Sequence, residues 1–201
     1  MDIERAIAKF KYNGYSVSYF ENAEDAASYL DRMIDKKSVG FGDSLTLLSM
    51  KLYERLSSHN KVFDPRNCSD GLDFIDTAKK CLTTEVYLTS VNALSETGEL
   101  VNIDGTGNRV GGALFGHEKV YFVSGTNKLV PNLEDAVWRA RNIAAPKNAM
   151  RLRKRTPCAK KGDRCYDCSC SDRICNCLTI HYKKMNNTEM EVVLINEQLG
   201  F

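Results

Sequence analysis

The amino-acid sequence predicts an α/β fold with a mainly parallel sheet and flanking helices. Segments of helical period alternate with short strand-type segments along the chain, and few residues separate them. The run KVYFVSG at residues 119–125 is apolar and rich in β-branched and aromatic residues, as expected for a strand buried on both faces. A chain of 201 residues is long enough to bury most of its apolar surface within one domain.

The first third of the chain contains two predicted helix–strand units. Apolar residues recur at helical spacing over residues 2–12, and YSVSYF at 15–20 alternates as a half-buried strand does. Asn22 is a suitable N-cap for a helix over 23–34. The stretch SVGFGDSLTLLSMKLYERL at 38–56 then predicts a strand, a tight Gly-x-Gly turn and a helix.

The remaining elements follow the same alternation. KVFD at 61–64 and EVYLTS at 85–90 predict strands with a helix between them, and a hairpin is expected around Gly98. The strongest helical pattern follows Pro131, with Asn132 as its cap, and Pro146 is expected to end it. The runs CLTIHY and MEVVLINE flank the turn-rich NNTE, which suits a closing hairpin.

Composition narrows the classes of partner and compartment. The formal net charge of +2 is too small to make nucleic acid an expected partner of the whole domain. The N-terminus lacks the apolar core of a signal peptide, and no run approaches a membrane span. We therefore expect a cytoplasmic protein, and in that reducing compartment clustered cysteines are more often metal ligands or redox groups than disulfides.

Three separated stretches carry a resemblance to a known family. They are VGFGDSLTL from residue 39, the long segment ETGELVNID…NAMRL at 96–152, and the TPC…C…C…RICN pattern at 156–176. In this order they resemble the LUD-domain proteins, in the LutC/YkgG-like group associated with lactate utilization, in its stand-alone form with a C-terminal cysteine motif. The resemblance makes residues 1–201 a single LUD domain, with 151–177 as a cysteine-rich, metal-binding excursion.

The resemblance also implies a fold and a role. The fold would be like that of the sugar-phosphate isomerase, CoA-transferase and methenyltetrahydrofolate-synthetase group. The role would be in bacterial oxidation of L-lactate to pyruvate, or in related organic-acid redox metabolism. The family supplies no defined catalytic mechanism for the domain, so the expectation leaves open whether the chain is an independent enzyme or a subunit of a lactate-oxidising system.

The first candidate ligand loop is the glycine-rich turn after the strand at residue 38. Glycines at such a turn allow backbone N–H groups to face an anion, and nearby hydroxyls can add donors. The alternative is an ordinary tight turn in which Asp43 or Ser44 caps the next helix. The candidate ligand-binding residues are Gly40, Gly42, Ser44 and Thr46.

The second candidate loop is NIDGTGNR at residues 102–109. Arg109 can grip a carboxylate or phosphate through two hydrogen bonds, and Asp104 and Glu96 are candidate catalytic acid/base groups. Gly105 and Asn108 complete the expected ligand-binding set of this loop. The alternative is a polar turn in which Asp104 caps the following helix and pairs with Arg109.

Lys128 follows the strand predicted at 119–125. Ligands of open α/β sheets gather beyond the carboxyl ends of the strands, so Lys128 is expected to meet an anion held by either loop. The alternative is a solvated loop lysine.

The cysteine-rich segment at residues 151–177, which we call the tail, contains a candidate metal site. A central C-x2-C presents two thiolates to one metal, and two flanking cysteines complete a zinc site or an iron–sulfur cluster. Seven of the fourteen residues from Arg151 to Arg164 are Lys or Arg, which would offset the thiolate charge. Spacing does not separate zinc from iron–sulfur. The resemblance implies an iron–sulfur cluster as the expected cofactor, with structural zinc or free redox-active thiols as alternatives. Of the six tail cysteines, the family pattern singles out as expected ligands Cys158, Cys165, Cys168 and Cys175.

These features favour a lactate-utilization protein that binds a small anionic ligand. One rival is a non-catalytic assembly or electron-transfer subunit that docks an iron–sulfur or lactate-oxidising partner. Another is a phosphosugar- or folate-type enzyme that uses Glu96 or Asp104 as its acid/base group. The sequence leaves homo-oligomer formation, the substrate and the roles of Cys170 and Cys177 open.

Overall fold

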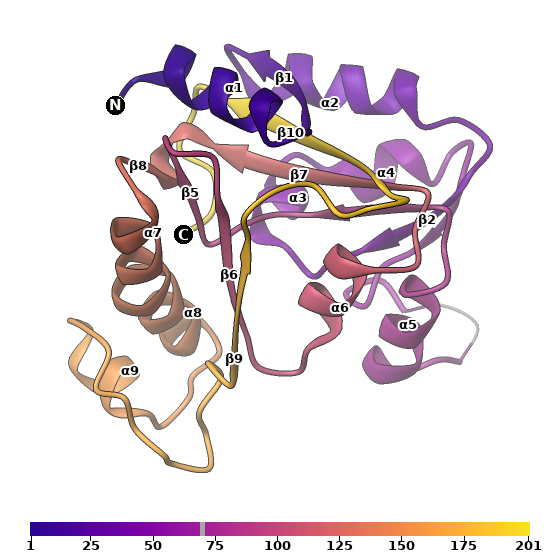
Figure 1. Cartoon of the computed structure of the whole chain (residues 1–201). Helices are drawn as coiled ribbons and strands as arrows, with labels where there is room; N and C mark the ends of the chain where they lie inside the picture. Colours follow the sequence, from indigo (N-terminus) through magenta and orange to yellow (C-terminus); the bar gives the residue numbers. More distant parts are fainter. Residues whose placement is uncertain (69–70) are drawn as a thin grey trace.

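The computed structural model describes residues 1–68 and 71–201 and has a six-stranded parallel sheet at its centre (Figure 1). The sheet is parallel throughout, as expected for strands joined by helical crossovers. This result confirms the predicted α/β class. In sheet order the strands are β1 (Ser16–Phe20), β10 (Glu189–Ile195), β7 (Lys119–Gly125), β4 (Val86–Thr89), β2 (Ser38–Phe41) and β3 (Lys61–Phe63).

The central strands are apolar on both faces because both faces are covered. Tyr121 and Val123 of β7 belong to one hydrophobic cluster, whereas Val120 and Phe122 belong to the cluster on the opposite face. Each buried side chain of this size contributes about 1.5–3 kcal/mol to the free energy of unfolding. The first face packs against α2 (Ala23–Met33), α3 (Leu45–Ser49) and α4 (Leu52–Leu56).

The second face is covered by helices and by a smaller sheet. The helices are α1 (Ile3–Tyr12), α5 (Phe74–Cys81) and α6 (Asn108–Leu114). The smaller sheet is mixed, and its strands in order are β8 (Leu129–Val130), β5 (Ala93–Ser95), β6 (Leu100–Asp104) and β9 (Cys177–His181). Strands β5 and β6 form the hairpin expected around Gly98, whose φ of 101° suits a residue without a side chain.

The last two strands do not form the predicted hairpin. Strand β9 pairs antiparallel with β6 in the smaller sheet, whereas β10 inserts between β1 and β7 in the parallel sheet. The reason is the pattern of burial. Strand β10 is buried along nearly all its length, so it fits the centre of the large sheet, while β9 is exposed at its start and lies at an edge.

The helix after Pro131 continues past Pro146, contrary to the sequence-based prediction. Helix α7 (Leu133–Arg139) runs through the π-turn η2 (Ala140–Ala144) into α8 (Ala145–Arg151). In the π-turn the Ala145 N–H donates to the Ala140 carbonyl, five residues back. This wider turn accommodates a proline ring that would otherwise clash with the preceding turn. Asn132 caps the helix as predicted, accepting from the Asp135 N–H at 2.9 Å.

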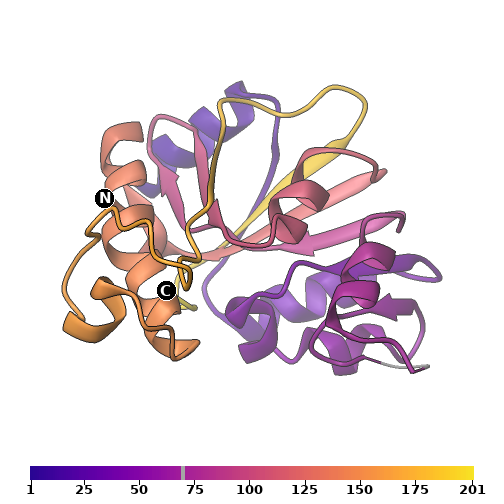
Figure 2. The same cartoon turned by 90° about the horizontal axis from the view of Figure 1, so that it is seen from below.

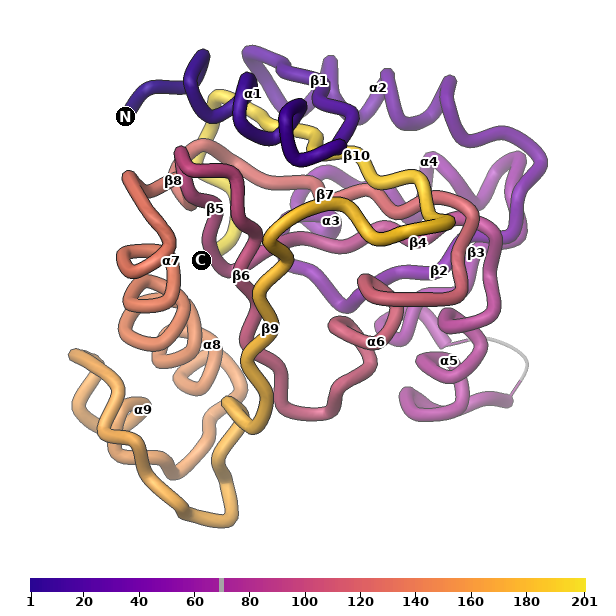
Figure 3. The backbone as a smooth tube through the Cα atoms, in the orientation of Figure 1, coloured from indigo at the N-terminus to yellow at the C-terminus, as the bar shows by residue number. Residues whose placement is uncertain are grey.

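The cysteine segment forms an excursion beside this long helix. In Figure 3 the chain leaves α8, passes through the short helix α9 (Pro157–Lys161) and returns along β9. The short 3-10 turn η1 (Thr126–Lys128) links β7 to β8. Over the two ranges given above, the structure contains no helix that is both long and apolar enough to cross a bilayer.

Candidate functional site

A cavity of about 440 Å³ opens beyond the carboxyl ends of three neighbouring strands, β2, β4 and β7. Gly42 follows β2, Ser90 follows β4 and Lys128 follows β7, and all three residues line the cavity, which we call the anion pocket. The end of β6 adds the loop that begins at Asp104. Further lining residues come from α8, the tail and the C-terminal end, and Figure 2 shows the C-terminus beside the orange helices. This is the position at which open α/β sheets bind ligands.

Lys128 lies at the base of the anion pocket, with only 3% of its surface exposed. Its Nζ donates to Ser90 Oγ at 3.0 Å, to Thr46 Oγ1 at 3.2 Å and to the Val91 carbonyl at 3.2 Å. None of these oxygens carries a formal charge, and no carboxylate of the described residues lies within ion-pair distance of Nζ. Burial, with lesser contributions from Arg139 and Arg109, lowers the Lys128 pKa to about 7. Lys128 is therefore a buried amine and not the solvated lysine of the alternative prediction.

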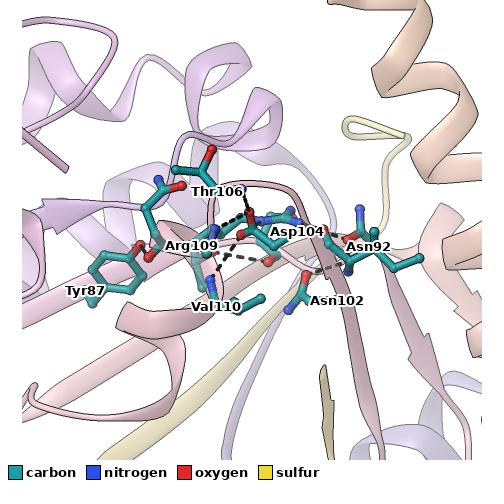
Figure 4. Close-up of polar contacts among 12 residues, drawn as sticks. Tyr87, Asn92, Asn102, Asp104, Thr106, Arg109 and Val110 are labelled. Atoms are coloured by element: carbon teal, nitrogen blue, oxygen red, sulfur yellow. Dashed lines mark hydrogen bonds and ion pairs between the residues drawn. The ribbon is translucent and has the colours of Figure 1, made fainter. Parts of the chain in front are cut away.

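The loop that begins at Asp104 is held by its own carboxylate (Figure 4). Asp104 Oδ1 accepts from the Thr106 and Gly107 N–H groups at 3.1 and 3.0 Å, and Oδ2 accepts from the Val110 N–H at 3.3 Å. Arg109 Nε lies 3.6 Å from the same carboxylate. Asp104 thus stabilises the turn into α6, as the structural alternative predicted, and most of its acceptor sites are already used.

Arg109 is also fixed by neutral partners. Its Nη2 donates to Asn92 Oδ1 at 2.9 Å and to the Ile103 carbonyl, and Asn92 Oδ1 accepts from the Ile103 N–H at 2.7 Å (Figure 4). These bonds link the end of β6 to the segment after β4. Gly105 and Asn108 line the same wall of the pocket, so the structure brings the predicted residues of this loop together.

The glycine-rich turn after β2 contributes one side of the pocket. Ser44 is the N-cap of α3, and its Oγ accepts from the Thr46 and Leu47 N–H groups at 3.2 and 3.5 Å. These amides are therefore engaged by the cap. Gly42, Ser44 and Thr46 line the pocket. Gly40 lies inside β2, where an added Cβ would meet the Cys81 carbonyl oxygen at 2.6 Å. The role of Gly40 is thus close packing against α5.

Glu96 lies away from the anion pocket, in the β5–β6 hairpin next to α1. Its Oε1 accepts from the Asp2 N–H at 2.9 Å, and Arg5 lies 4.0 Å from its other oxygen. The cavity lined by Lys128 does not reach it. The candidate acid/base pair Glu96 and Asp104 is therefore not brought together at one site.

The sequence-based prediction missed the wall supplied by α8 and the tail. Arg151 at the end of α8 and Lys154 just after it line the pocket, and Arg173 and Asn176 line it from the tail. The signal was present as a basic run, but its cations were assigned to the cysteines alone. Basic side chains at the pocket outnumber the acidic ones, Asp43 and Asp104, and both acids are paired, with Arg66 and Arg109 respectively. The basic residues of the lining are Arg109, Lys128, Arg151, Lys154 and Arg173.

The four predicted metal ligands share a second, much smaller cavity. It lies between α8, α9 and the tail, has a free volume of about 10 Å³, and is lined by Cys158, Cys165, Cys168 and Cys175. Their thiols are free, and among the described residues no three Cys, His, Asp or Glu side chains already lie in a metal-coordinating arrangement. Burial raises the pKa of the Cys81 thiol to about 11, whereas Cys68 is exposed.

Comparison with known proteins identifies the family. The fold resembles the crystal structure of a DUF162 family protein from Deinococcus radiodurans, with a TM-score of 0.54 and 11% identity over 96% of this chain and 95% of that one. No curated protein matches the chain significantly. The family model described as the LUD domain matches residues 3–195. Because this match spans almost the whole sequence, the chain belongs to the LUD domain family.

Proposed function

We propose that this LUD-domain protein takes part in lactate utilization, in the oxidation of L-lactate to pyruvate or in related organic-acid redox metabolism, by binding a small organic anion. The family supplies the link to lactate, and the basic side chains of the pocket indicate that its ligand is an anion. The binding site is the anion pocket, with Lys128 at its base and Arg109 on its wall.

The observation that carries this proposal is the environment of Lys128. A buried ammonium group without a carboxylate partner is costly, because burial removes its hydration and neutral oxygens restore only part of it. Lys128 has three such oxygens and no described acidic partner. A carboxylate or phosphate entering the pocket would supply the missing negative charge. Binding of an anion would therefore stabilise the protonated lysine and raise its pKa.

The rest of the pocket suits the same class of ligand. Arg151 Nε donates to Asn148 Oδ1 at 2.9 Å, and neither it nor Lys154 has an ion-pair partner among the described residues. Cations from several segments line the pocket and can bind an acid group, with the hydroxyls of Thr46 and Ser90 near the lysine. The volume of about 440 Å³ is within the range of sites for ligands larger than a three-carbon acid.

The chain's own residues would bind and orient the anion, and none of them is well placed as a general base at the pocket. The Asp104 carboxylate is committed to backbone N–H groups and Arg109. Lys128 is protonated when it holds an anion, so it would act as the binding cation and not as the proton acceptor. Electron removal from such an acid requires a separate oxidant, which fits a role as one subunit of an oxidising system.

Two experiments test this proposal. A thermal-shift series with L-lactate, pyruvate, inorganic phosphate and sugar phosphates asks which anion binds the native state, because such binding must raise the unfolding midpoint. We expect a rise with an organic acid. A rise with sugar phosphates alone would favour the phosphosugar-type enzyme instead. Disruption of the gene in its host is expected to impair growth on L-lactate, and unimpaired growth would contradict the lactate assignment.

A further inference from the structure

The segment Arg173–Asn176 lies between two sites. On one side Arg173, Ile174 and Asn176 line the anion pocket. On the other side Arg173 and Ile174 also line the small cavity that contains the four thiols, which we call the thiol cavity. A short piece of chain thus forms the partition between the two, and any movement of it changes both.

The partition is tied to the pocket loop by direct contacts. The Asn176 N–H donates to the Asp104 carbonyl at 2.9 Å, and Asn176 Nδ2 donates to the Gly105 carbonyl at 3.0 Å. Gly105 approaches the tail so closely that an added Cβ would lie 2.8 Å from the Ile174 carbonyl oxygen. The pairing of β6 with β9 begins at the next residue, with Asp104 opposite Cys177. Displacement of the partition must therefore displace the Asp104 loop.

The partition is equally tied to the thiol cavity. Arg173 donates from Nη1 to the Cys168 carbonyl at 2.6 Å and from Nε to the Cys175 carbonyl at 3.0 Å. Its guanidinium lies beside Asp167, which also pairs with Arg141. Arg173 and Arg141 both line the thiol cavity, so two fixed cations face the place where thiolate charge would develop. The remaining lining includes the apolar side chains of Ala145, Pro146 and Ala149.

The cysteines sort into two groups in the structure. Four of the six tail thiols line the thiol cavity. Cys177 does not: it begins the edge strand β9 and is exposed. Cys170 also lies outside the cavity, with its Sγ 3.4 Å from that of Cys168. The four thiols share a cavity but are not yet gathered around one point. Binding of a metal would therefore draw their segments inward, together with the partition between them.

We propose that one thiolate-held metal centre fixes this partition and thereby shapes the anion pocket, and that its ligands are Cys158, Cys165, Cys168 and Cys175. Each thiol gives up its proton when it binds the metal, and four thiolates around Zn²⁺ or an oxidised four-iron cluster leave a net charge of about −2. The cations of the partition and of α8 offset that charge. This inference rests on the proposed function only for the role of the anion pocket.

The ligand set is tested on the whole chain, purified without oxygen, by metal analysis and a visible spectrum. Zinc at a one-to-one ratio in a colourless protein, or iron and sulfide in a brown one, supports the centre and identifies it. C175S is expected to lose the metal, whereas the matched variant C177S, two residues away, retains it. A protein without bound metal, or a C170S variant that loses metal while C158S keeps it, would overturn the ligand set.

The coupling is tested by hydrogen–deuterium exchange of the metal-loaded and chelated chains. After chelation, and in C175S, amides of residues 102–108 and 173–180 should exchange at least about tenfold faster, because the bonds from Asn176 to the loop open more often. Amides of β7 and β10 should be unchanged, which shows that the core remains folded. Equal exchange of the 102–108 amides with and without metal would overturn the coupling.

A parallel titration with inorganic phosphate and L-lactate separates this inference from the proposed function. We expect both forms to bind the same anion, with weaker affinity in the chelated form. Failure of both anions to bind either form would count against the anion pocket, while the exchange result would still decide whether the metal fixes the partition. Equal affinity in the two forms would contradict any effect of the metal on the pocket.

Discussion

The Lys128 ammonium lies 3.2 Å from the Thr46 hydroxyl, although 82 residues separate them in the sequence. Thr46 comes from the helix after β2 and Lys128 from the turn after β7, so the parallel sheet brings the two together at its carboxyl edge. This contact joins the glycine-rich turn to the lysine and defines the base of the anion pocket. The first predictions concern its energetics.

Replacement of Lys128 by Met should separate stability from binding. The change removes a buried amine that has no acidic partner, so the free energy of unfolding at pH 6 is expected to rise by about 1 kcal/mol. Thr46 and Ser90 remain partnered with each other at 3.3 Å. Urea unfolding measures the difference, with K147M on the exposed side of α8 as the control. A large loss of stability in K128M would show that Lys128 is a structural residue.

Lys128 should also give stability a pH dependence. Its pKa is about 7 in the folded protein and about 10.5 when exposed, so the unfolded chain holds an extra proton between these values. The free energy of unfolding should therefore rise with pH over this window, by up to about 1.4 kcal/mol per pH unit. The difference in the free energy of unfolding between wild type and K128M, measured from pH 6 to pH 10, isolates this contribution. A difference that does not change with pH would contradict the lowered pKa of Lys128.

Asp104 is expected to act on the loop and not as an acid/base catalyst. Asp104→Asn keeps one acceptor oxygen but replaces the second with a donor that cannot accept from Val110 or pair with Arg109. The free energy of unfolding should fall by about 1–3 kcal/mol. Glu134→Gln, on an exposed turn of α7, is the matched control. Unchanged stability of D104N would free Asp104 for a chemical role at the pocket.

Gly40 should prove sensitive to size although it does not line the pocket. An added methyl group would lie 2.6 Å from the Cys81 carbonyl oxygen and 2.8 Å from Thr84 Oγ1, so Gly40→Ala should cost about 1–3 kcal/mol of stability. In Gly111→Ala the new methyl group meets only Leu82, at 3.8 Å, and stability should be kept or slightly increased. Denaturant midpoints of the two variants compare these sites. Equal midpoints would contradict close packing at Gly40.

Sequence patterns correctly predicted the helix starts and strands that depend on residues close together in the sequence. Asn22 and Asn132 cap helices as predicted, because a cap needs only its own side chain and the next few N–H groups. The run at 119–125 forms a central strand because it is apolar on both faces. The end of the helix at Pro146 and the pairing of the last two strands were predicted wrongly. A π-turn absorbs the proline, and the partners of β9 and β10 are distant in the sequence.

The candidate site was only partly accessible to the same reasoning. Lys128 was placed near an anion because it follows a predicted strand, Thr46 because it offers a hydroxyl at the glycine-rich turn, and Arg109 because it can grip an acid group. Arg151, Arg173 and the separate location of Glu96 depend on how the long helix and the tail fold back, which no local pattern records. The four cysteines of the TPC…RICN pattern do line one cavity, but whether they bind metal remains a prediction.

The most direct test of the anion pocket is calorimetric titration of wild type, K128M and K147M at pH 6.5 with L-lactate and inorganic phosphate. Lys128 is largely protonated at this pH. We predict that wild type and K147M bind at least one of these anions with the same affinity, and that K128M binds it at least about tenfold more weakly, the loss expected for one charged hydrogen bond. Equal affinity in all three proteins would contradict the assignment of Lys128 as the anion-binding cation.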